Sequence, residues 1–358
     1  MKPDIILEYI TKIPPLADHF KGTSLHVNEI GDGNLNFVFR VSDDANRSLI
    51  LKYAPPYLRL LGEDFKLPQN RICVEMHTMG YFESIAPSFV PKLFHCDEEA
   101  FCFVMEDLRA HRLLQRVRLD EEISLHVYAK LGHFLALLYT HKPPLHGEGF
   151  YENATLKTIS ENYIFRFPHI IGHEALSVPP FFKPRPKSAL FLANMSTLTS
   201  LFLNEKECLI HGDLHTGSIL IHEESAKIID AEFSCFAPLG FDMGVLLAHM
   251  LFGELHAMML DKKVQTQSAL ETLWEHFTLH VNDVPPHILS QSVGFCGVEL
   301  YRRLVVPAQA KPLLSLPKQL QPKAYARVEA LAIAFVEHYL HVKQLPDMLR
   351  LLKEHAWL

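Results

Sequence analysis

The chain has 358 residues, of which 48% are hydrophobic and 21% are charged, and 34 basic residues stand against 41 acidic ones. This composition excludes an intrinsically disordered chain, which would lack the apolar surface needed to offset chain entropy, and the length favours two domains. The net charge of −7, without a basic stripe, excludes a general nucleic-acid binder, so we expect no nucleic-acid partner.

The first third of the chain predicts a small lobe that combines strands and helices. Charged side chains such as Asp4, Glu8 and Asp18 exclude a secretory signal peptide. β-Branched and aromatic segments around a polar turn predict a hairpin, and apolar residues at steps of three and four predict a long helix. The expected elements are a helix over 4–11, strands over 37–41 and 48–53, a helix over 69–86 and a strand over 101–105.

The rest of the chain is predicted to be mostly helical. Residues 143–186 are rich in Pro, Phe and His, and we expect a long irregular loop that is functional or mobile. Segment 241–260 is the best membrane candidate, but Asp242 and Glu254 make it too polar to span a bilayer. The expected elements are helices over 125–138, 190–203, 240–260, 267–280, 287–306 and 325–341, with short strands over 208–210, 218–221 and 226–229.

The six cysteines are scattered and form no CxxC pair. This spacing favours reduced, buried thiols over a disulfide framework, which is typical of small secreted domains. Without a signal peptide, a disulfide framework or a membrane segment, the sequence predicts a cytoplasmic protein that has no membrane partner.

A glycine-containing segment, residues 30–36 (Ile-Gly-Asp-Gly-Asn-Leu-Asn), precedes the first predicted strand. Gly31 and Gly33 would let the backbone approach a phosphate closely, with amide N–H groups free to donate. The segment is neither a Walker A loop nor a dinucleotide-binding fingerprint, because no Gly-Lys-Ser/Thr follows and a strand comes next. Taken alone, it also fits an ordinary glycine-rich turn.

Lys52 ends an apolar strand, and Glu75 lies in the following helix. A lysine on a buried strand needs a counter-charge, because an unpaired buried ammonium is unfavourable. We therefore expect Glu75 to pair with Lys52 while the ammonium holds phosphate oxygens. The alternative is that Lys52 extends to solvent and Glu75 belongs to a polar helix face.

The most informative segment is residues 208–221, in which an apolar strand leads into His211-Gly-Asp213 and a second apolar strand follows. A loop between two strands would fix the Asp213 carboxylate, which could accept a proton from an attacking hydroxyl group. The apolar flanks argue against a surface turn. His211 and His215 are four residues apart, but the Gly-Asp between them disfavours a helical zinc pair.

Asp230 and Glu232 follow another apolar strand, and two carboxylates at one edge are suited to Mg²⁺, which prefers oxygen ligands. Asp242 opens a predicted helix, and we expect it to orient the loop around Asp213. A glycine loop, a strand Lys, a helix Glu, a His-x-Asp loop and an acidic turn occur in the order found in kinases. The sequence therefore predicts a phosphotransferase of kinase-like design.

The chain resembles the S-methyl-5-thioribose kinase family, within the aminoglycoside and choline kinase-like group. The resemblance rests on segments 31–41, 211–219, 230–233 and 238–244, on Gly297-Val-Glu-Leu-Tyr-Arg-Arg303, and on the substrate-proximal segment 153–167. It covers nearly the whole chain. Two departures from the wider pattern are Ser218, where protein kinases have Asn, and Ala231, where the family usually has Pro.

The resemblance implies a role for each matching residue. Asp213 would be the catalytic base, with Arg302 and Arg303 near the sugar and the transferred phosphoryl group. Asp230 and Glu232 would bind Mg²⁺. The remaining residues would hold ATP, with Met105 and Glu106 at the adenine hinge; they are Gly31, Asp32, Gly33, Asn34, Asn36, Lys52, Glu75, Met105 and Glu106.

We expect an α+β, bilobal protein-kinase-like fold, with a small β-rich N-terminal ATP-binding lobe over 1–107 and a larger, mostly helical catalytic lobe over 108–358. The expected reaction transfers phosphate from ATP-Mg²⁺ to the 1-hydroxyl of 5-methylthioribose, and the product would enter methionine salvage. In this expectation Asp213, Asp230 and Glu232 converge on the terminal phosphate. Homodimers are common among relatives, so a homodimer is one allowed state.

Two alternatives stay open at this point. One is a kinase of the same fold that acts on another hydroxyl substrate, such as an aminoglycoside, choline or homoserine. The acids at 120–122 would supply part of the acidic surface that an aminoglycoside needs, but no dense acidic cluster stands out. The other alternative is a non-catalytic nucleotide-binding module, which the presence of all the required acids disfavours.

Overall fold

The computed structural model describes residues 2–30, 35–59, 62–143, 150–170 and 172–358. The chain forms two compact units, one made of residues 1–111 together with 227–233, and the other made of 112–226 and 234–358. The first unit therefore ends a few residues beyond position 107, and it includes a short segment from much later in the chain. That segment carries Asp230 and Glu232.

A five-stranded antiparallel sheet with the strand order β1-β2-β3-β5-β4 forms the centre of the first unit. The predicted hairpin is β2 and β3, and Lys52 of β3 stands opposite Val38 on one side and Phe103 on the other. Strands β1 and β4 were not individually predicted. The strands are β1 (Leu25–Glu29), β2 (Phe37–Asp43), β3 (Ser48–Tyr53), β4 (Leu93–Asp97) and β5 (Cys102–Glu106).

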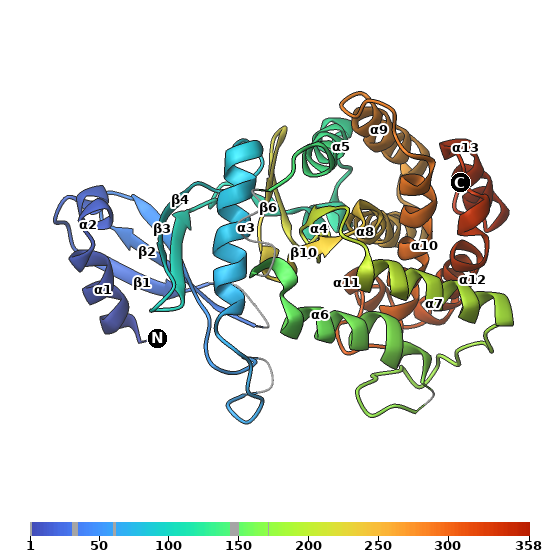
Figure 1. Cartoon of the computed structure of the whole chain (residues 1–358), viewed down its shortest axis with the longest axis horizontal. Helices are drawn as coiled ribbons and strands as arrows, with labels where there is room; N and C mark the ends of the chain where they lie inside the picture. Colours follow the sequence, from blue (N-terminus) through green and yellow to red (C-terminus); the bar gives the residue numbers. More distant parts are fainter. Residues whose placement is uncertain (1, 31–34, 60–61, 144–149, 171) are drawn as a thin grey trace. The chain divides into compact units, whose positions relative to one another are not determined.

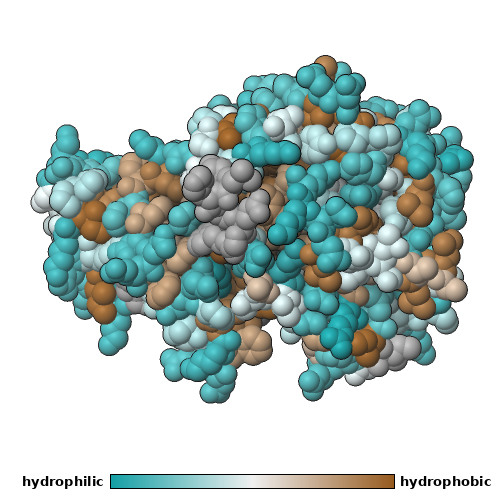
Figure 2. Space-filling model, in the orientation of Figure 1, coloured by the Kyte–Doolittle hydropathy of each residue, from teal (hydrophilic) through white to brown (hydrophobic). Residues whose placement is uncertain are grey.

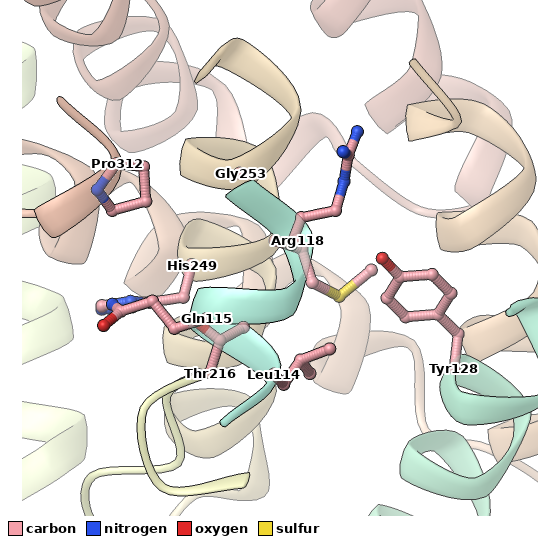
Figure 3. Close-up of a pocket in the computed structure, with 9 residues that line it drawn as sticks. Leu114, Gln115, Arg118, Tyr128, Thr216, His249, Gly253 and Pro312 are labelled. Atoms are coloured by element: carbon pink, nitrogen blue, oxygen red, sulfur yellow. The ribbon is translucent and has the colours of Figure 1, made fainter. Parts of the chain in front are cut away.

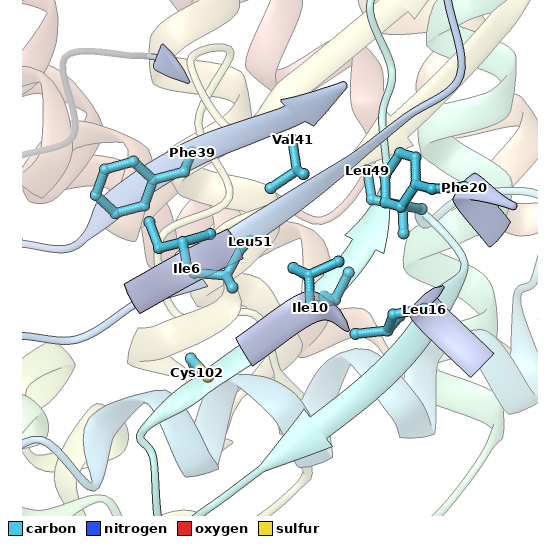
Figure 4. Close-up of a cluster of buried hydrophobic side chains, with 10 residues drawn as sticks. Ile6, Ile10, Leu16, Phe20, Phe39, Val41, Leu49, Leu51 and Cys102 are labelled. Atoms are coloured by element: carbon cyan, nitrogen blue, oxygen red, sulfur yellow. The ribbon is translucent and has the colours of Figure 1, made fainter. Parts of the chain in front are cut away.

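One face of this sheet packs against two short helices, α1 (Pro3–Lys12) and α2 (Pro14–Phe20). Figure 4 shows Ile6 and Ile10 of α1 among the side chains of the strands, where they form a buried core. The predicted helix over 4–11 is present, and a second helix, which was not predicted, starts at Pro14. Proline is well suited to the first helical turn, since its missing N–H would be unpaired there in any case.

Helix α3 (Arg71–Ile85) supplies the other core of the first unit. Its residues Ile72 and Met76 pack with Ile50 and Phe103 of the sheet. The predicted apolar face is therefore present, and it brings the polar Glu75 of the same helix into a buried position. Burial of Glu75 beside the sheet is what makes a pair with Lys52 possible.

The second unit is mostly helical, as predicted. Figure 1 shows α8 beside α10 and α5 beside α9 within this unit. Strand β7 pairs with β10, whereas β8 pairs with β6, so the strands on either side of Asp213 belong to different sheets. The main helices are α4 (Leu114–Asp120), α5 (Leu125–Thr140), α7 (Ala189–Asn204), α8 (Leu239–Met259), α9 (Thr266–Thr278), α10 (Pro286–Arg302), α11 (Lys311–Leu314), α12 (Gln321–His338) and α13 (Leu345–Glu354). The strands are β6 (Arg112–Leu113), β7 (Cys208–Ile210), β8 (Ile219–His222), β9 (Ser225–Ile228) and β10 (Cys235–Ala237).

Glycines let the central helices of the second unit approach closely. A Cβ atom at Gly244 of α8 would lie 2.7 Å from the carbonyl oxygen of Ser292 in α10. A Cβ atom at Gly297 of α10 would lie 2.8 Å from the carbonyl oxygen of Ala332 in α12. Backbone atoms cannot move aside as side chains do, so glycine at these positions fixes how α8, α10 and α12 pack.

The expectation that residues 143–186 are irregular was partly wrong. This region contains η2 (Phe150–Glu152), α6 (Ala154–Ser160), the π-helical turn η3 (Glu161–Arg166) and η4 (Phe167–His169). The prolines of the region lie around these turns rather than inside α6, so they do not interrupt it. Residues 144–149 and 171 lie outside the described residues.

The visible surface carries mostly hydrophilic side chains, with hydrophobic residues in small groups among them (Figure 2). In the part of the chain that the structure describes, no helix combines the length and the apolar character needed to cross a bilayer. The polar groups of segment 241–260 belong to α8, which is buried along most of its length.

Candidate active site

Lys52 is buried in the first unit next to a group of acidic residues. Its side chain is 3% exposed, and its Nζ atom is 2.6 Å from Oε1 of Glu75 and 2.5 Å from Oδ1 of Asp230. The predicted pair of Lys52 with Glu75 is therefore formed, and Asp230 joins it. Asp230 has a positive φ of 66°, a conformation that turns the chain directly after the strand β9.

The electrostatics of this cluster show an excess of negative charge. Burial alone would lower the pKa of Lys52, but Asp230 and Glu75 raise it well above its usual value, so the ammonium stays charged. Burial raises the pKa of Glu75, and so do the neighbouring carboxylates, while Lys52 offsets part of the shift. Burial and the charge of Asp230 likewise raise the pKa of Glu232. Lys52 and Arg71 are the two cations near these three carboxylates, so the negative charge exceeds the positive charge when all three carboxylates are ionised.

Asn36 connects the segment after the glycines to Glu232. Its side-chain amide donates to Oε2 of Glu232 at 2.8 Å, and its carbonyl oxygen accepts from Nε of Arg71 at 3.1 Å. Arg71 also donates to the backbone carbonyls of Leu35 and Pro55. Sequence analysis missed Arg71, which stands at the start of α3 and has no recognisable motif around it.

The other predicted nucleotide residues of the first unit are placed as follows. Met105 is buried in β5 opposite Ile50, and Glu106 ends the same strand, where its backbone N–H donates to the carbonyl of Lys92. Gly31, Asp32, Gly33 and Asn34 lie outside the described residues.

The His-Gly-Asp loop of the second unit is held by Asp242. The Asp242 carboxylate accepts the backbone N–H of His211 at 2.6 Å and that of Gly212 at 2.9 Å. Gly212 has a φ of 84°, which a side chain would strain. The prediction that Asp242 orients this loop is confirmed, because its two bonds determine the course of the backbone that leads into Asp213.

The contribution of Asp242 to stability is expected to depend on pH. Burial raises the pKa of Asp242 to about 7, although the two backbone N–H groups lower it in part. In the unfolded chain the pKa of the Asp242 carboxyl group is about 4, so the unfolded chain releases the carboxyl proton at lower pH than the folded protein does. The free energy of unfolding should fall as the pH rises from about 4 to about 7, because the folded state binds the proton more tightly.

The Asp242→Asn variant cannot ionise at this position, so its free energy of unfolding should fall less than that of the wild type over the same window. Urea denaturation at about pH 5 and about pH 8 measures both proteins. If the difference between the free energies of unfolding of the two proteins is the same at both pH values, Asp242 does not titrate in this range.

His215 and Ser218 fix the other end of the loop. Nδ1 of His215 accepts the backbone N–H of Gly217 at 2.9 Å, so the neutral ring carries its proton on Nε2. That Nε2 atom lies 3.4 Å from Oδ2 of Asp213. The Ser218 hydroxyl donates to the backbone carbonyl of Asp213 at 3.0 Å. Ser218, which stands where protein kinases have Asn, therefore stabilises the loop.

The structure brings both predicted arginines to Asp213. Nη2 of Arg303 and Nη2 of Arg302 lie 3.7 Å and 3.9 Å from Oδ1 of Asp213. Burial raises the pKa of Asp213, but the nearby His215 and the two guanidinium groups lower it below its usual value. The lowered pKa means that the carboxylate is ionised. The Asp213 side chain is 29% exposed, so a ligand can reach it.

Sequence analysis assigned no role to two buried residues beside the arginines, Glu299 of α10 and His249 of α8. Glu299 forms ion pairs with Arg302 and Arg303, and its Oε1 atom is 3.0 Å from Nε2 of His249. The spacing of Glu299 three and four residues before the arginines was the available signal, because such residues share one helix face. No feature of the sequence pointed to a role for His249, because it lies 50 residues away from Glu299 in the chain.

A divalent metal ion would need the carboxylates of the first unit. Among the described residues, no group of three His, Cys, Asp or Glu side chains is arranged to hold a metal ion by itself. Mg²⁺ is commonly bound by one or two carboxylates together with substrate phosphates and water. Asp230 and Glu232 fit that donor set, and a cation would relieve the charge repulsion that raises the pKa of Glu232.

Comparisons with known proteins identify the family of the chain. A model of the phosphotransferase enzyme family matches residues 26–277. The chain is 32% identical over 349 residues to the methylthioribose kinase of Bacillus cereus (strain AH820), covering 87% of this chain and 86% of that protein. It is 31% identical over 341 residues to the methylthioribose kinase of Geobacillus sp. (strain WCH70), covering 86% of this chain and 85% of that protein.

Solved structures identify the fold. A choline kinase from Streptococcus pneumoniae matches with a TM-score of 0.51 at 15% identity, covering 92% of this chain and 98% of that one. A choline kinase from Cryptosporidium parvum matches with a TM-score of 0.51 at 12% identity, covering 99% of each chain. The predicted α+β, protein-kinase-like fold is therefore confirmed.

Proposed function

Because the chain belongs to the phosphotransferase enzyme family, we propose that it is a kinase that transfers the γ-phosphoryl group of ATP to the 1-hydroxyl of 5-methylthioribose. The observation that carries this proposal is the environment of Asp213. An ionised, partly exposed carboxylate stands next to two buried guanidinium groups on a loop that Asp242 holds. The resemblance inferred from the sequence motifs is the same as that of the curated relatives.

Asp213 is the catalytic base in this reaction. Its lowered pKa keeps the carboxylate ionised at neutral pH, so that it can accept the proton of the attacking hydroxyl group. The sugar oxygen forms a bond to the γ-phosphorus, the bond from this phosphorus to the bridging oxygen breaks, and ADP leaves. General-base assistance of this kind contributes roughly 10²- to 10⁴-fold in rate.

Arg302 and Arg303 stabilise the phosphoryl group during transfer. A guanidinium presents N–H donors in a rigid plane that matches phosphoryl oxygens, and it stays charged when buried. Catalysis of phosphoryl transfer rests mainly on such positioning and charge stabilisation. The two arginines therefore act on the same reacting group as the neighbouring Asp213.

The first unit holds the nucleotide. Lys52, kept in place by Glu75, binds phosphate oxygens, and Met105 and Glu106 bind adenine through backbone groups. Asp230 and Glu232 hold Mg²⁺, which when bound supplies positive charge to the phosphate oxygens. The residues around the glycines, Gly31, Asp32, Gly33, Asn34 and Asn36, cover the phosphates.

The domain roles follow from these assignments. Residues 1–107 form the ATP-binding lobe, to which the segment 227–233 adds Asp230 and Glu232, and the rest of residues 108–358 form the catalytic and substrate-binding lobe. The product, 5-methylthioribose 1-phosphate, belongs to methionine salvage, so the enzyme works in the cytoplasm. A homodimer is one allowed assembly, and gel filtration with light scattering measures the oligomeric state.

The experiment that tests this function is a coupled ATPase assay with methylthioribose, kanamycin, choline and homoserine as acceptors. We expect turnover with methylthioribose and formation of one equivalent of ADP for each sugar phosphate. Turnover with only one of the other acceptors would contradict the sugar-kinase assignment. Tight ATP binding without turnover on any acceptor would instead favour a nucleotide-binding module.

A further inference from the structure

Glu299 lies between the two arginines and carries four hydrogen bonds. Oε1 accepts Nε of Arg303 at 2.7 Å and Nη2 of Arg302 at 3.1 Å, and Oε2 accepts Nε of Arg302. The fourth donor is Nε2 of His249 at 3.0 Å. The Glu299 side chain is 1% exposed, so these bonds form without competition from water.

The charge state of this group is well defined. Burial raises the pKa of Glu299, but Arg302 and Arg303 lower it by more, to well below its usual value. Burial lowers the pKa of His249 to about 3, so its ring is neutral and donates through Nε2–H. One anion therefore lies between two cations and one neutral donor.

His249 is too enclosed to meet a substrate. It lines a cavity of about 10 Å³ together with Gln115, Thr216 and Gly253, which leaves room for about one water molecule at most (Figure 3). Its Nδ1 atom has no hydrogen-bond partner among the described residues. The hydrogen bond of His249 is made with Glu299, and its ring also packs against the ring of His215 at a centroid distance of 5.0 Å.

The bonds to Glu299 determine which atoms of the arginines remain for other partners. Arg303 uses Nε for Glu299 and Nη1 for the carbonyl of Ala308 at 3.0 Å, which leaves Nη2 on the side of Asp213. Arg302 is held by two of its nitrogens in a bidentate pair with Glu299. Arg303 is therefore held through Nε and Nη1, whereas Nη2 of Arg302 both donates to Glu299 and faces Asp213. An Nη2 atom of each arginine lies within 4 Å of the Asp213 carboxylate.

We propose that Glu299 is a positioning residue that orients the Arg302 and Arg303 guanidinium groups beside Asp213 and thereby sets the rate of phosphoryl transfer. The proposal rests on the proposed function, since it assigns Glu299 an effect on the same reaction. The competing explanation is that Glu299 only neutralises buried charge and so contributes to stability alone. The two explanations predict different values of kcat for a folded Glu299 variant. Positioning predicts a lower kcat, whereas a role in stability alone predicts an unchanged kcat.

The matched control is a second buried carboxylate in the same unit. Oε1 of Glu254 in α8 accepts a hydrogen bond from Nε of Arg118 at 2.7 Å, and both residues are buried. Among the described residues, neither forms a hydrogen bond or an ion pair with Asp213. Glu254→Gln should therefore lower stability in the same way as Glu299→Gln, while leaving kcat within about twofold of the wild type.

In Glu299→Gln we expect kcat to fall by about 10- to 100-fold, because a misplacement of about 1 Å in a catalytic group costs a factor of this order. The KM for ATP should change by less than about threefold, since Glu299 does not belong to the predicted nucleotide residues. Glu299→Asp keeps the charge but is one methylene shorter, so it should lose at least about 5-fold in kcat even though it remains folded.

A double-mutant cycle separates positioning from general stability. If Glu299 acts through the arginines, Glu299→Gln should lower kcat by a smaller factor in an Arg303→Ala background than in the wild type, because only Arg302 then remains to be positioned. Thermal unfolding and circular dichroism establish that each variant is folded. If Glu299→Gln does not fold, the Glu299→Asp variant and its own cycle with Arg303→Ala decide the question.

A kcat close to the wild-type value in folded Glu299→Gln or Glu299→Asp would overturn the proposal. It would also be overturned if Glu299→Gln lowered kcat by the same factor in the presence and in the absence of the Arg303 side chain. The rates are measured with whichever acceptor the wild type phosphorylates, or as ATP hydrolysis by water if it phosphorylates none. A wild type inactive on methylthioribose therefore contradicts the proposed substrate, whereas the comparison among variants tests Glu299 independently.

Discussion

Asp213→Asn is expected to lower kcat by about 10³-fold or more, while the affinity for ADP changes by less than about threefold. The amide has nearly the same shape as the carboxylate, but it cannot accept the proton of the attacking hydroxyl group. The nucleotide contacts predicted for Lys52 and Asp230 do not involve Asp213, so binding should persist. Steady-state kinetics and calorimetric titration with ADP measure the two quantities.

The control for this prediction is Asp283→Asn, an exposed aspartate in the same unit. It should leave kcat unchanged. Asp213 is also a counter-charge for Arg302 and Arg303, so circular dichroism must show that the variant keeps its helices. A folded Asp213→Asn enzyme with more than about a tenth of wild-type kcat would remove Asp213 as the base.

Asp230→Asn is expected to lower kcat by about 10²- to 10³-fold and to raise the Mg²⁺ concentration for half-maximal activity by more than about tenfold. The reason lies in the exposure of the carboxylates around Lys52. The Asp230 side chain is 45% exposed, whereas that of Glu75 is 1% exposed. Asp230 can therefore reach a metal ion and a phosphate, while Glu75 is confined to holding Lys52.

A Mg²⁺ titration of initial rates, followed by removal of the metal with a chelator, measures this effect. Asp43→Asn is the matched control, because Asp43 is a buried carboxylate of the same unit that pairs with Arg47 in a turn away from Lys52. Its Mg²⁺ dependence should equal that of the wild type. An unchanged Mg²⁺ dependence in Asp230→Asn would show that this carboxylate is not a ligand of the metal.

The local elements of the fold could be predicted wherever one residue pattern was strong. The strand over 48–53 was predicted from an apolar segment next to a polar turn. The helix predicted over 69–86, which the structure shows from 71 to 85, was predicted from apolar residues at steps of three and four. The helix that starts at Pro14 and the helix over 154–160 were missed, because proline-rich flanks hid short segments whose stability comes from packing.

For the site, the motifs around Lys52, Asp213 and Asp230 identified the acids and the lysine, because each stands next to an apolar strand that ends in polar residues. The pair of Lys52 with Glu75 also followed from charge, since a buried ammonium requires a carboxylate. These inferences needed only neighbouring residues and the rules of charge burial.

Tertiary packing alone decided which side chains support the acids and the arginines. Glu299 and His249 lie on α10 and α8, and close approach at Gly244 brings those helices together. Asp242 reaches the backbone of His211 and Gly212 across 30 residues or more of sequence. A linear pattern records which residues are adjacent along the chain, whereas hydrogen bonds between distant segments exist only once the helices have packed.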